Sequence, residues 1–555
     1  MPSADQYVNE RLDHLGIVAG VCQEIGLAAW LDAQDERSHE RVSVGTATVA
    51  MILNGLGFSN RQLYLVPQFF ANKPVERLLG PGITPADLND DCLGRTLDWL
   101  YAHDPTTLFA GIAAQARRVF GIRTRQVHVD TTSFSVSGAY VPEEGDLDAT
   151  TIAITYGYSR DRRADLKQWM LALATTHEGD VPVFLRPLSG NSSDQVSLLA
   201  AVEALQEQLR APETAEEAMY VADGAIYSVA NMTRLNALGI PWTSRVPGTS
   251  MEAKAALGRT DVTWQQSADG TTSWWSQTLS LPQGEERWVI VRTQAGEAQG
   301  RAKVYRAVEK AQQEWTQRLW HLSRQEFACE ADAVAALERE RKELPSWLEV
   351  QGQVVAQPRY ATKGRPRKEA APVASVWHLQ AQVSVNQQRV EQEVQRQACF
   401  IVGTNQLDPA RLSAEELVAT YKDQGGVERG FRFLKDPLFL ASSVFLKKPE
   451  RIMALSLIMV LCLLVYRLAE QRLRSRLAET EQTIPDQVNK PTTRPTLRWV
   501  FQCFEGIEVL HIHTQGMVTT LTLRLEPLHE QILALLGPPY QALYHADQPG
   551  AKEHR

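Results

Sequence analysis

The order of strand-like and helix-like segments between residues 121 and 246 constrains the fold more than any other feature of this sequence. Alternating or short apolar runs predict five strands, at 126–134, 151–158, 168–176, 219–222 and 240–246. Apolar residues near helical spacing predict a helix at 193–209, and a second helix separates the last two strands. The resulting order, three strands, helix, strand, helix and strand, predicts an α/β domain built on one mixed five-stranded sheet.

Two aspartates occupy informative places in this order. Asp130 lies inside the first strand, in a run that alternates through Val127 and Val129, and Asp223 directly follows the fourth strand. In a ribonuclease H-like sheet the first strand lies beside the fourth, which would make the two aspartates neighbours across roughly 5 Å. Crowded carboxylates repel one another unless a cation joins them, so both are candidate metal ligands. His128 is interpreted as a residue on the opposite face of the strand from Asp130 that packs there or supports the site from behind, with a direct role in the site as the alternative.

The segment YKDQGGVERGFRFLK, residues 421–435, places an acid among groups that bind phosphate. Its polar side chains recur at spacings of 3, 4, 4 and 3 residues, which predicts that they share one face of a helix. These residues are Tyr421, Gln424, Glu428, Arg432 and Lys435. A solvated helix face with ordinary charge pairs would show the same pattern. The two upstream aspartates favour the other interpretation, in which Glu428 is a third metal ligand.

Taken together, Asp130, Asp223 and Glu428 resemble the DDE triad of bacterial insertion-sequence transposases. The similar branch of that family has a tyrosine-arginine-glutamate-lysine signature and a long insertion between its second aspartate and its glutamate. The runs GYSRDRRADLKQWMLAL, LSGNSSDQ and FRFLKDPLFLASSVFLKKPERIMALSLIMVLCLLVYRLAE also resemble the core of this family. The resemblance covers residues 120 to 480 and implies a ribonuclease H-like catalytic core.

One position departs from that signature. Tyr421, Glu428 and Lys435 match it, but Gln424 stands where arginine is usual. The missing charge would then come from a nearby arginine, either Arg429 or Arg432. The resemblance implies that Tyr421 and Lys435 hold a phosphate of the transferred or flanking strand, because a phenol and an ammonium suit it.

The expected chemistry follows from the ligands. Carboxylate oxygens suit Mg²⁺, with Mn²⁺ as a substitute, and three carboxylates can hold two ions beside a scissile phosphate. The resemblance implies an enzyme that cuts its element's ends and joins the 3′ ends to target DNA. Its partners would be double-stranded DNA, both terminal repeats and target, and a second copy of the chain in the DNA complex. Two alternatives are a catalytically silent DNA-binding descendant and a ribonuclease H-like nuclease without strand transfer.

A net charge of −8 argues against a surface with general affinity for DNA, so local patches must bind it. The clearest patch is QPRYATKGRPRK, residues 357–368, whose KGRPRK core resembles an AT-hook that lies along a minor groove. A solvated linker is the alternative, because Gly and Pro prevent a helix there. The candidate DNA contacts in this basic hook are Lys363, Arg365, Arg367 and Lys368. Arg245 is a further candidate, as a phosphate contact or as part of a structural ion pair.

Other features indicate a cytoplasmic bacterial protein that associates with DNA and not with a membrane. The six cysteines form no CxxC pair and indicate reduced thiols, and the first residues lack a signal peptide. The apolar run at 452–466 is too short to span a bilayer and is flanked by arginines, so it predicts a buried helix. Trp274 and Trp275 are interpreted as buried in the sheet of the insertion, with stacking on a flipped base as the alternative.

Five regions are expected along the chain. A helical N-terminal domain for DNA binding or assembly precedes a catalytic core in two parts, which an insertion of mixed strands and helices separates. A small subdomain follows at the C-terminus. Their predicted bounds are 1–120 for the N-terminal domain, 121–246 and 397–478 for the core, 247–396 for the insertion with the basic hook, and 479–555 for the tail.

Overall fold

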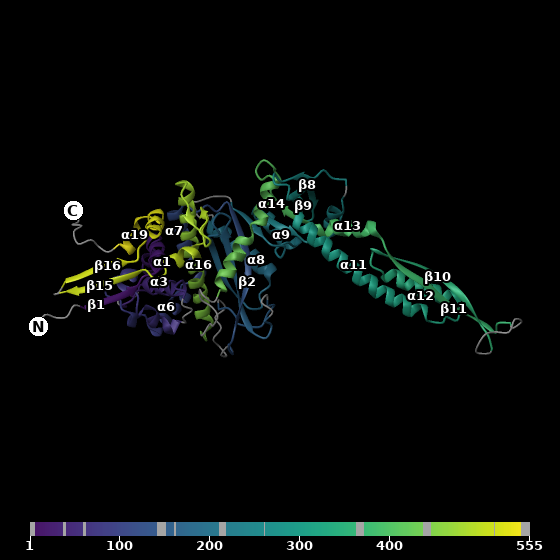
Figure 1. The fold of residues 1–555 in the computed structure, drawn as a ribbon, viewed down its shortest axis with the longest axis horizontal. Coiled ribbons are helices and arrows are strands. Elements are labelled where there is room, and N and C mark those ends of the chain that lie inside the picture. The colour runs from purple at the N-terminus through teal and green to yellow at the C-terminus, as the bar shows by residue number, and fades with distance from the viewer. Residues whose placement is uncertain are drawn as a thin grey trace. The chain divides into compact units, whose positions relative to one another are not determined.

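The computed structural model describes residues 6–36, 40–58, 63–140, 151–159, 163–209, 218–259, 261–361, 371–436, 446–514 and 517–545 (Figure 1). The chain divides into two compact units. The first unit joins Met1–Ser244 to Ala419–Arg555, and the second is Arg245–Val418.

The sheet of the first unit carries the residues of interest. In spatial order its strands are β4 (Pro182–Ser189), β3 (Lys167–Thr176), β2 (Gln126–Val136), β5 (Met219–Ala222) and β6 (Trp242–Val246). β3 is antiparallel to both β2 and β4, whereas β2, β5 and β6 are parallel. The crossover helices are α8 (Asp194–Leu209) and α9 (Val229–Ala237). The pairing of the first strand with the fourth is therefore confirmed, and so are the strand at 168–176 and everything predicted after it, but the three strands that open the order are not the three that were predicted.

One predicted strand is wrong. Residues 151–158 form only an isolated bridge, in which Thr155 and Gln168 exchange backbone hydrogen bonds. The third strand is β4, which follows β3 through a tight turn where Asp180 has a positive φ of 53°. The alternation in 151–158 has another cause, because Ile152 and Ile154 are each only 5% exposed and belong to the core.

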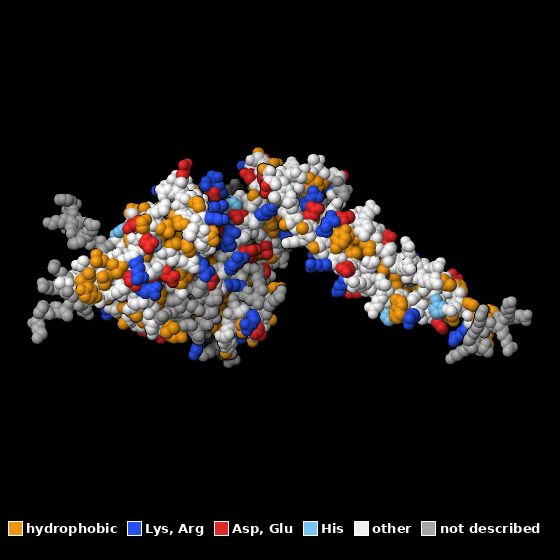
Figure 2. Space-filling view, in the orientation of Figure 1, with side chains coloured by type: hydrophobic (Ala, Val, Ile, Leu, Met, Phe, Trp, Pro, Cys, Tyr) orange, Lys and Arg blue, Asp and Glu red, His pale blue; other side chains and the backbone are white. Residues whose placement is uncertain are grey.

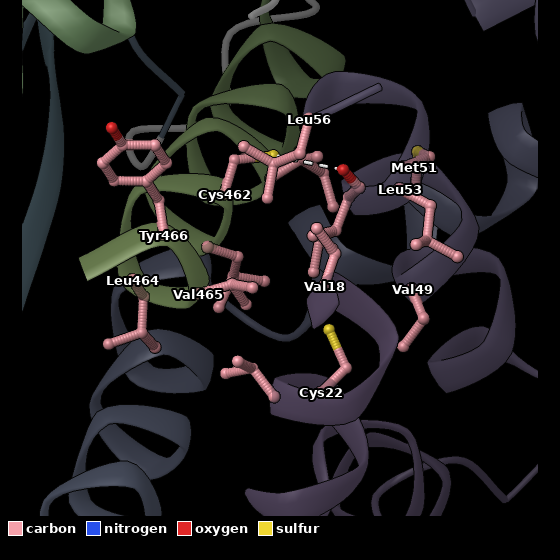
Figure 3. Packing of buried hydrophobic residues seen from close by; sticks show 14 of the residues in the cluster. Val18, Cys22, Val49, Met51, Leu53, Leu56, Cys462, Leu464, Val465 and Tyr466 are labelled. Atoms are coloured by element: carbon pink, nitrogen blue, oxygen red, sulfur yellow. Dashed lines mark hydrogen bonds between the residues drawn. The ribbon is translucent and has the colours of Figure 1, made fainter. Parts of the chain in front are cut away.

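A long apolar helix, α16 (Pro449–Glu479), organises the rest of the first unit. By length and composition it could cross a membrane, but its apolar window is entirely buried within the protein. The predicted buried helix is confirmed, and it is longer than the apolar run. Figure 3 shows Cys462 and Val465 of α16 packed close to side chains of α1 and α3.

The helices that precede the sheet pack around α16, with α1, α3, α6 and α7 in direct contact with it (Figure 1). Because these helices cover α16, its apolar surface lies in a protein core and not at a lipid surface. The helical elements of this part are α1 (Leu15–Glu24), α2 (Leu27–Asp32), α3 (Val44–Gly55), the 3₁₀ turn Leu63–Leu65, α4 (Val66–Phe70), α5 (Val75–Leu79), the 3₁₀ turn Pro85–Leu88, α6 (Asp90–Ala102) and α7 (Pro105–Phe120).

The two ends of the chain fold together. β1 (Gln6–Arg11) pairs with β15 (Glu508–Thr514), which pairs with β16 (Met517–Leu523). α19 (Pro538–Tyr544) packs on α1, where Gly16 permits the approach of the Tyr544 ring, since a Cβ at Gly16 would lie 2.5 Å from that ring. The remaining C-terminal elements are β13 (Ile484–Pro485), β14 (Pro491–Thr492), α17 (Leu497–Cys503) and α18 (Pro527–Leu536).

The second unit has two parts. In one, α10 (Met251–Gly258) and α13 (Gln387–Ala398) accompany the strands β7 (Gln265–Gln266), β8 (Thr272–Leu281), β9 (Gly284–Thr293) and β12 (Cys399–Thr404). In the other, α11 (Gln294–Ser323) and α12 (Glu330–Glu343) run beside a hairpin of β10 (Leu348–Arg359) and β11 (Ala374–Val385) (Figure 1). Trp274 and Trp275 are 5% and 6% exposed, which confirms their interpretation as buried residues.

Candidate active site

The parallel pairing of β2 with β5 sets the two candidate aspartates side by side. The paired residues end at Val129 opposite Ala222, so Asp130 and Asp223 are the next residues on neighbouring strands. Both side chains are partly exposed. Oδ1 of Asp130 accepts a hydrogen bond from the backbone N–H of Thr131 at 2.7 Å, and Oδ1 of Asp223 accepts one from Ala225 at 2.8 Å. Local backbone therefore orients each carboxylate.

Asp130 and His128 share a face of β2, and the prediction that they point to opposite faces is wrong. Residues two apart on a strand lie on the same side, and the intervening Val129 belongs to the separate core beneath α8. Nε2 of His128 lies 3.3 Å from Nδ1 of His177. Burial, with smaller effects from His177 and Arg429, lowers the pKa of His128 to about 3. The imidazole is therefore neutral and packs beside the site.

Residues 421–435 form two helices and not the single helix that their spacing predicts. α14 (Ala414–Lys422) ends before Asp423, and α15 (Gly425–Leu434) begins after Gln424. Asp423 in this turn pairs with His177 at 3.2 Å. Gly426 lies directly against Asp180, where a Cβ would come within 2.2 Å of Oδ1. Only glycine permits so close an approach.

The break in the helix changes the predicted row of side chains. Tyr421 belongs to the last turn of α14, and Gln424 is the N-cap residue of α15. Gln424, Glu428 and Lys435 keep their helical spacing along α15, and Glu428 is exposed. Arg432 also keeps its four-residue spacing from Glu428, so four of the five predicted positions still belong to a single helix and only Tyr421 does not.

α15 crosses the face of the sheet that carries Asp130. Just before it, in the last turn of α14, the Thr420 hydroxyl donates to Oε1 of Gln126 on β2 at 3.1 Å. In its middle, a Cβ at Gly430 would lie 3.4 Å from Leu173, the residue that pairs with Asp130 across β2 and β3. At its end, Nζ of Lys435 lies 5.6 Å from the ring centre of Phe134. The helix thus follows β2 and carries Glu428 over the face where Asp130 lies.

The three acids share a region but do not converge on one point. Within the described ranges, no group of three His, Cys, Asp or Glu side chains is close enough to hold a single metal ion. The structure brings Asp130 and Asp223 together through strand pairing and places Glu428 on the helix above β2. Their donor chemistry, carboxylate oxygen throughout, fits a hard cation such as Mg²⁺.

The other predicted DNA contacts have different environments. Arg245 is exposed, and its guanidinium lies 5.5 Å from the ring centre of Phe400. Arg429 forms a bidentate pair with Asp180, with N–O distances of 2.9–3.1 Å, whereas Arg432 is exposed and has no acid partner in the described part of the chain. Arg432 is therefore the better source of the charge that Gln424 lacks. Lys363, Arg365, Arg367 and Lys368 of the basic hook lie outside the described residues.

Sequence reasoning missed a cavity of about 510 Å³ in the first unit, called the arginine cavity below. Six arginines and four acids line most of it, from α15, α16, the segment that enters α17 and the turns that contain Asp180 and Asp423. Figure 2 shows basic and acidic side chains interspersed on the surface near α16. The lining residues are Asp180, Asp423, Arg429, Arg432, Phe433, Asp436, Tyr466, Arg467, Glu470, Arg474, Arg494, Thr496 and Arg498. A sequence signal exists in the seven-residue spacing of Arg467 and Arg474 on one helix.

Comparisons with known proteins assign the class. Residues 139–465, more than half of the chain, match the family described as "Transposase DDE domain". The chain belongs to this family, and the protein is a transposase. The matched range includes Asp223 and Glu428 and begins nine residues after Asp130. Residues 7–114 match a second family, described as "Domain of unknown function (DUF4277)". No curated protein matches the chain.

Two solved transposase structures show limited similarity. One is a piggyBac transposase synaptic complex with hairpin DNA, at 9% identity and a TM-score of 0.36, covering 99% of this chain and 90% of that one. The other is the Mos1 transposase paired-end complex with the left transposon end, at 14% identity and a TM-score of 0.15. That match covers 40% of this chain and 64% of the Mos1 chain.

Proposed function

We propose that this transposase cuts DNA at the ends of its own insertion sequence and joins the freed 3′ ends to target DNA. The observation that carries the proposal is the pairing of β2 with β5, which sets Asp130 and Asp223 at adjacent positions on the sheet. The strand order β4-β3-β2-β5-β6, with β3 antiparallel, supports a ribonuclease H-like core. Asp130, Asp223 and Glu428 are its three proposed catalytic acids.

These acids are proposed to hold two Mg²⁺ ions, which Mn²⁺ can replace. Bound there, such ions activate the attacking oxygen and stabilise the departing one. The backbone N–H groups of Thr131 and Ala225 orient the two aspartates before any ligand arrives. Glu428 projects from α15 as an exposed side chain and has to turn toward the aspartates for all three to share the ions.

The DNA contacts proposed near the acids are Tyr421, Gln424, Arg432 and Lys435. Arg432 takes the place of the arginine that the family signature has at Gln424, because it is exposed and has no acid partner among the described residues. Guanidinium and ammonium groups position a phosphate without reading sequence. A catalytically silent descendant would have lost an acid, and all three acids are present.

We propose that two copies of the chain act together on the two element ends in the bacterial cytoplasm.

The metal requirement gives a direct test. Purified protein, incubated with duplexes that carry its own element ends and a target plasmid, should cut and join DNA with Mg²⁺ or Mn²⁺. Ca²⁺ should support binding only, because it takes more ligands at longer distances. Sequencing of the product ends measures both steps. Full activity in EDTA contradicts the metal mechanism, and cutting without joining favours the nuclease alternative.

The basic hook gives a second expected result. Replacing Arg365 and Arg367 with alanine should weaken binding to element ends and reduce the slope of log affinity against log salt by about one to two, because each lost phosphate contact releases one counterion fewer. Cutting at saturating protein should change little. Anisotropy titrations at several KCl concentrations measure the slope. An unchanged slope makes the segment a linker, whereas lost cutting at saturation places it at the active site.

A further inference from the structure

The arginine cavity has more positive than negative charge. Three of its arginines share two acids: Asp180 pairs with Arg429, and Glu470 pairs with both Arg467 and Arg474. Asp436 pairs with Arg498, and Asp423 lies between His177 and Arg429. Arg429, Arg432 and Arg494 are the exposed arginines of the lining, and within the described residues no acid pairs with the last two. Six arginines against four acids leave a formal charge of +2 around the cavity.

One wall of the cavity contains an unsatisfied donor. Arg467 is only 7% exposed, and its Nη1 donates to Oε2 of Glu470 at 2.8 Å. Its Nε is buried and has no hydrogen-bond partner. A buried N–H without an acceptor is costly, and native structures seldom keep one without a reason. Because Arg467 lines the cavity, an oxygen of a bound anion is the kind of group that can supply the missing acceptor.

The cavity and the candidate catalytic row lie on different sides of α15. At 3.6 residues per turn, Gln424, Glu428 and Lys435 fall within about 40° of one another around the helix axis. Arg429 and Phe433, which line the cavity, lie about 100° or more away from Glu428, with Arg432 between the two rows. The exposed edge of α15 therefore separates the candidate cutting site from the arginine cavity, and Arg432 stands on that edge.

We propose that the arginine cavity binds a backbone phosphate of the DNA strand that crosses α15, close to the phosphate presented to Glu428. This inference rests on the proposed function, since it needs DNA over α15. Guanidinium groups match phosphate because they donate in planar pairs. The excess charge fits an anion, and the arginines that pair with acids form the walls around it. A free phosphate ion shares this chemistry, and the experiment separates the two sources.

The test compares two alanine variants of the full chain. Arg494→Ala removes an exposed arginine of the cavity that has no acid partner in the described residues, and Arg476→Ala removes an exposed arginine of α16 outside the cavity. A fluorescent duplex of mixed sequence is titrated at several KCl concentrations. Arg494→Ala should weaken binding several-fold and make the salt slope shallower by about one, whereas Arg476→Ala should leave the slope unchanged. Arg494→Lys, which keeps the charge, should retain most of the slope.

Inorganic phosphate provides the second arm. If phosphate raises the Tm of the wild type but not of Arg494→Ala, and that variant has a wild-type salt slope with DNA, the cavity is a free-phosphate site and the proposal is overturned. Equal slopes for all variants without any phosphate effect overturn it as well. Cutting by the wild type with Mg²⁺ tests the proposed function separately. If the wild type cuts element ends but Arg494→Ala binds DNA with an unchanged salt slope, only the assignment of the cavity is wrong and the proposed function stands.

Discussion

Replacing Asp130, Asp223 or Glu428 with alanine is expected to lower cleavage of element ends by more than about a hundredfold, because mutating residues that merely support a metal ligand already costs 10-fold to 100-fold. Each change removes a hard oxygen donor and no positive charge, so binding of the same DNA should remain close to that of the wild type. Gel-resolved cleavage of labelled ends with Mg²⁺, together with anisotropy in Ca²⁺, measures the two quantities separately.

Asp194 supplies a matched control for the first of these acids. It begins α8, and its Oδ1 accepts a hydrogen bond from the Thr131 hydroxyl at 2.7 Å. It therefore contacts the residue next to Asp130, but from the other face of β2. Asp194→Ala should keep cutting within a few-fold of the wild type. If it cuts as poorly as Asp130→Ala, loss of strand geometry and not loss of a ligand explains the effect. Wild-type cutting by any of the three acid variants removes that residue from the site.

The neighbouring positions of Asp130 and Asp223 were predictable from sequence because they depend on strand order. Alternation identified β2, the short apolar run identified β5, and the order of the elements left few ways to pair them. The failure at residues 151–158 has the opposite cause. Ile152 and Ile154 are buried there without strand pairing, and periodicity records burial and not hydrogen bonding.

The helix break at Asp423 and Gln424 depends on contacts with distant residues. Gly426 packs against Asp180, and Asp423 pairs with His177, both more than two hundred residues earlier in the chain. The spacing of Tyr421 and Glu428 depends only on the local sequence and gives no information about these distant partners. A continuous helix was therefore the natural interpretation. The arginine cavity was unpredictable for the same reason, since segments near residues 180, 430, 470 and 495 meet there.

The second large effect concerns the stability of the first unit. Glu470 is 4% exposed, and its carboxylate accepts hydrogen bonds from Arg467 at 2.8 Å and from the backbone N–H of Leu497 at 3.1 Å. It also forms an ion pair with Arg474 at 2.9 Å. Glu470→Ala should destabilise this unit by about 3–5 kcal/mol, because removing one partner of a buried pair leaves the other charge uncompensated. The urea midpoint of the transition that exposes α16, followed by hydrogen exchange of its amides, measures the loss.

The same helix contains its own control. Arg476 and Glu479 repeat the three-residue spacing of Arg467 and Glu470, but their side chains are 49% and 58% exposed, against 9% and 4% for the buried pair. Water screens the exposed pair, so Glu479→Ala should change stability by no more than about 0.5 kcal/mol. A similar cost for both variants would mean that the carboxylate of Glu470 does not compensate buried charge. A much larger loss of stability for Glu470→Ala than for Glu479→Ala would show that Glu470 compensates the buried charges of Arg467 and Arg474. These two arginines line the arginine cavity, so Glu470 would then be the residue that holds them in position.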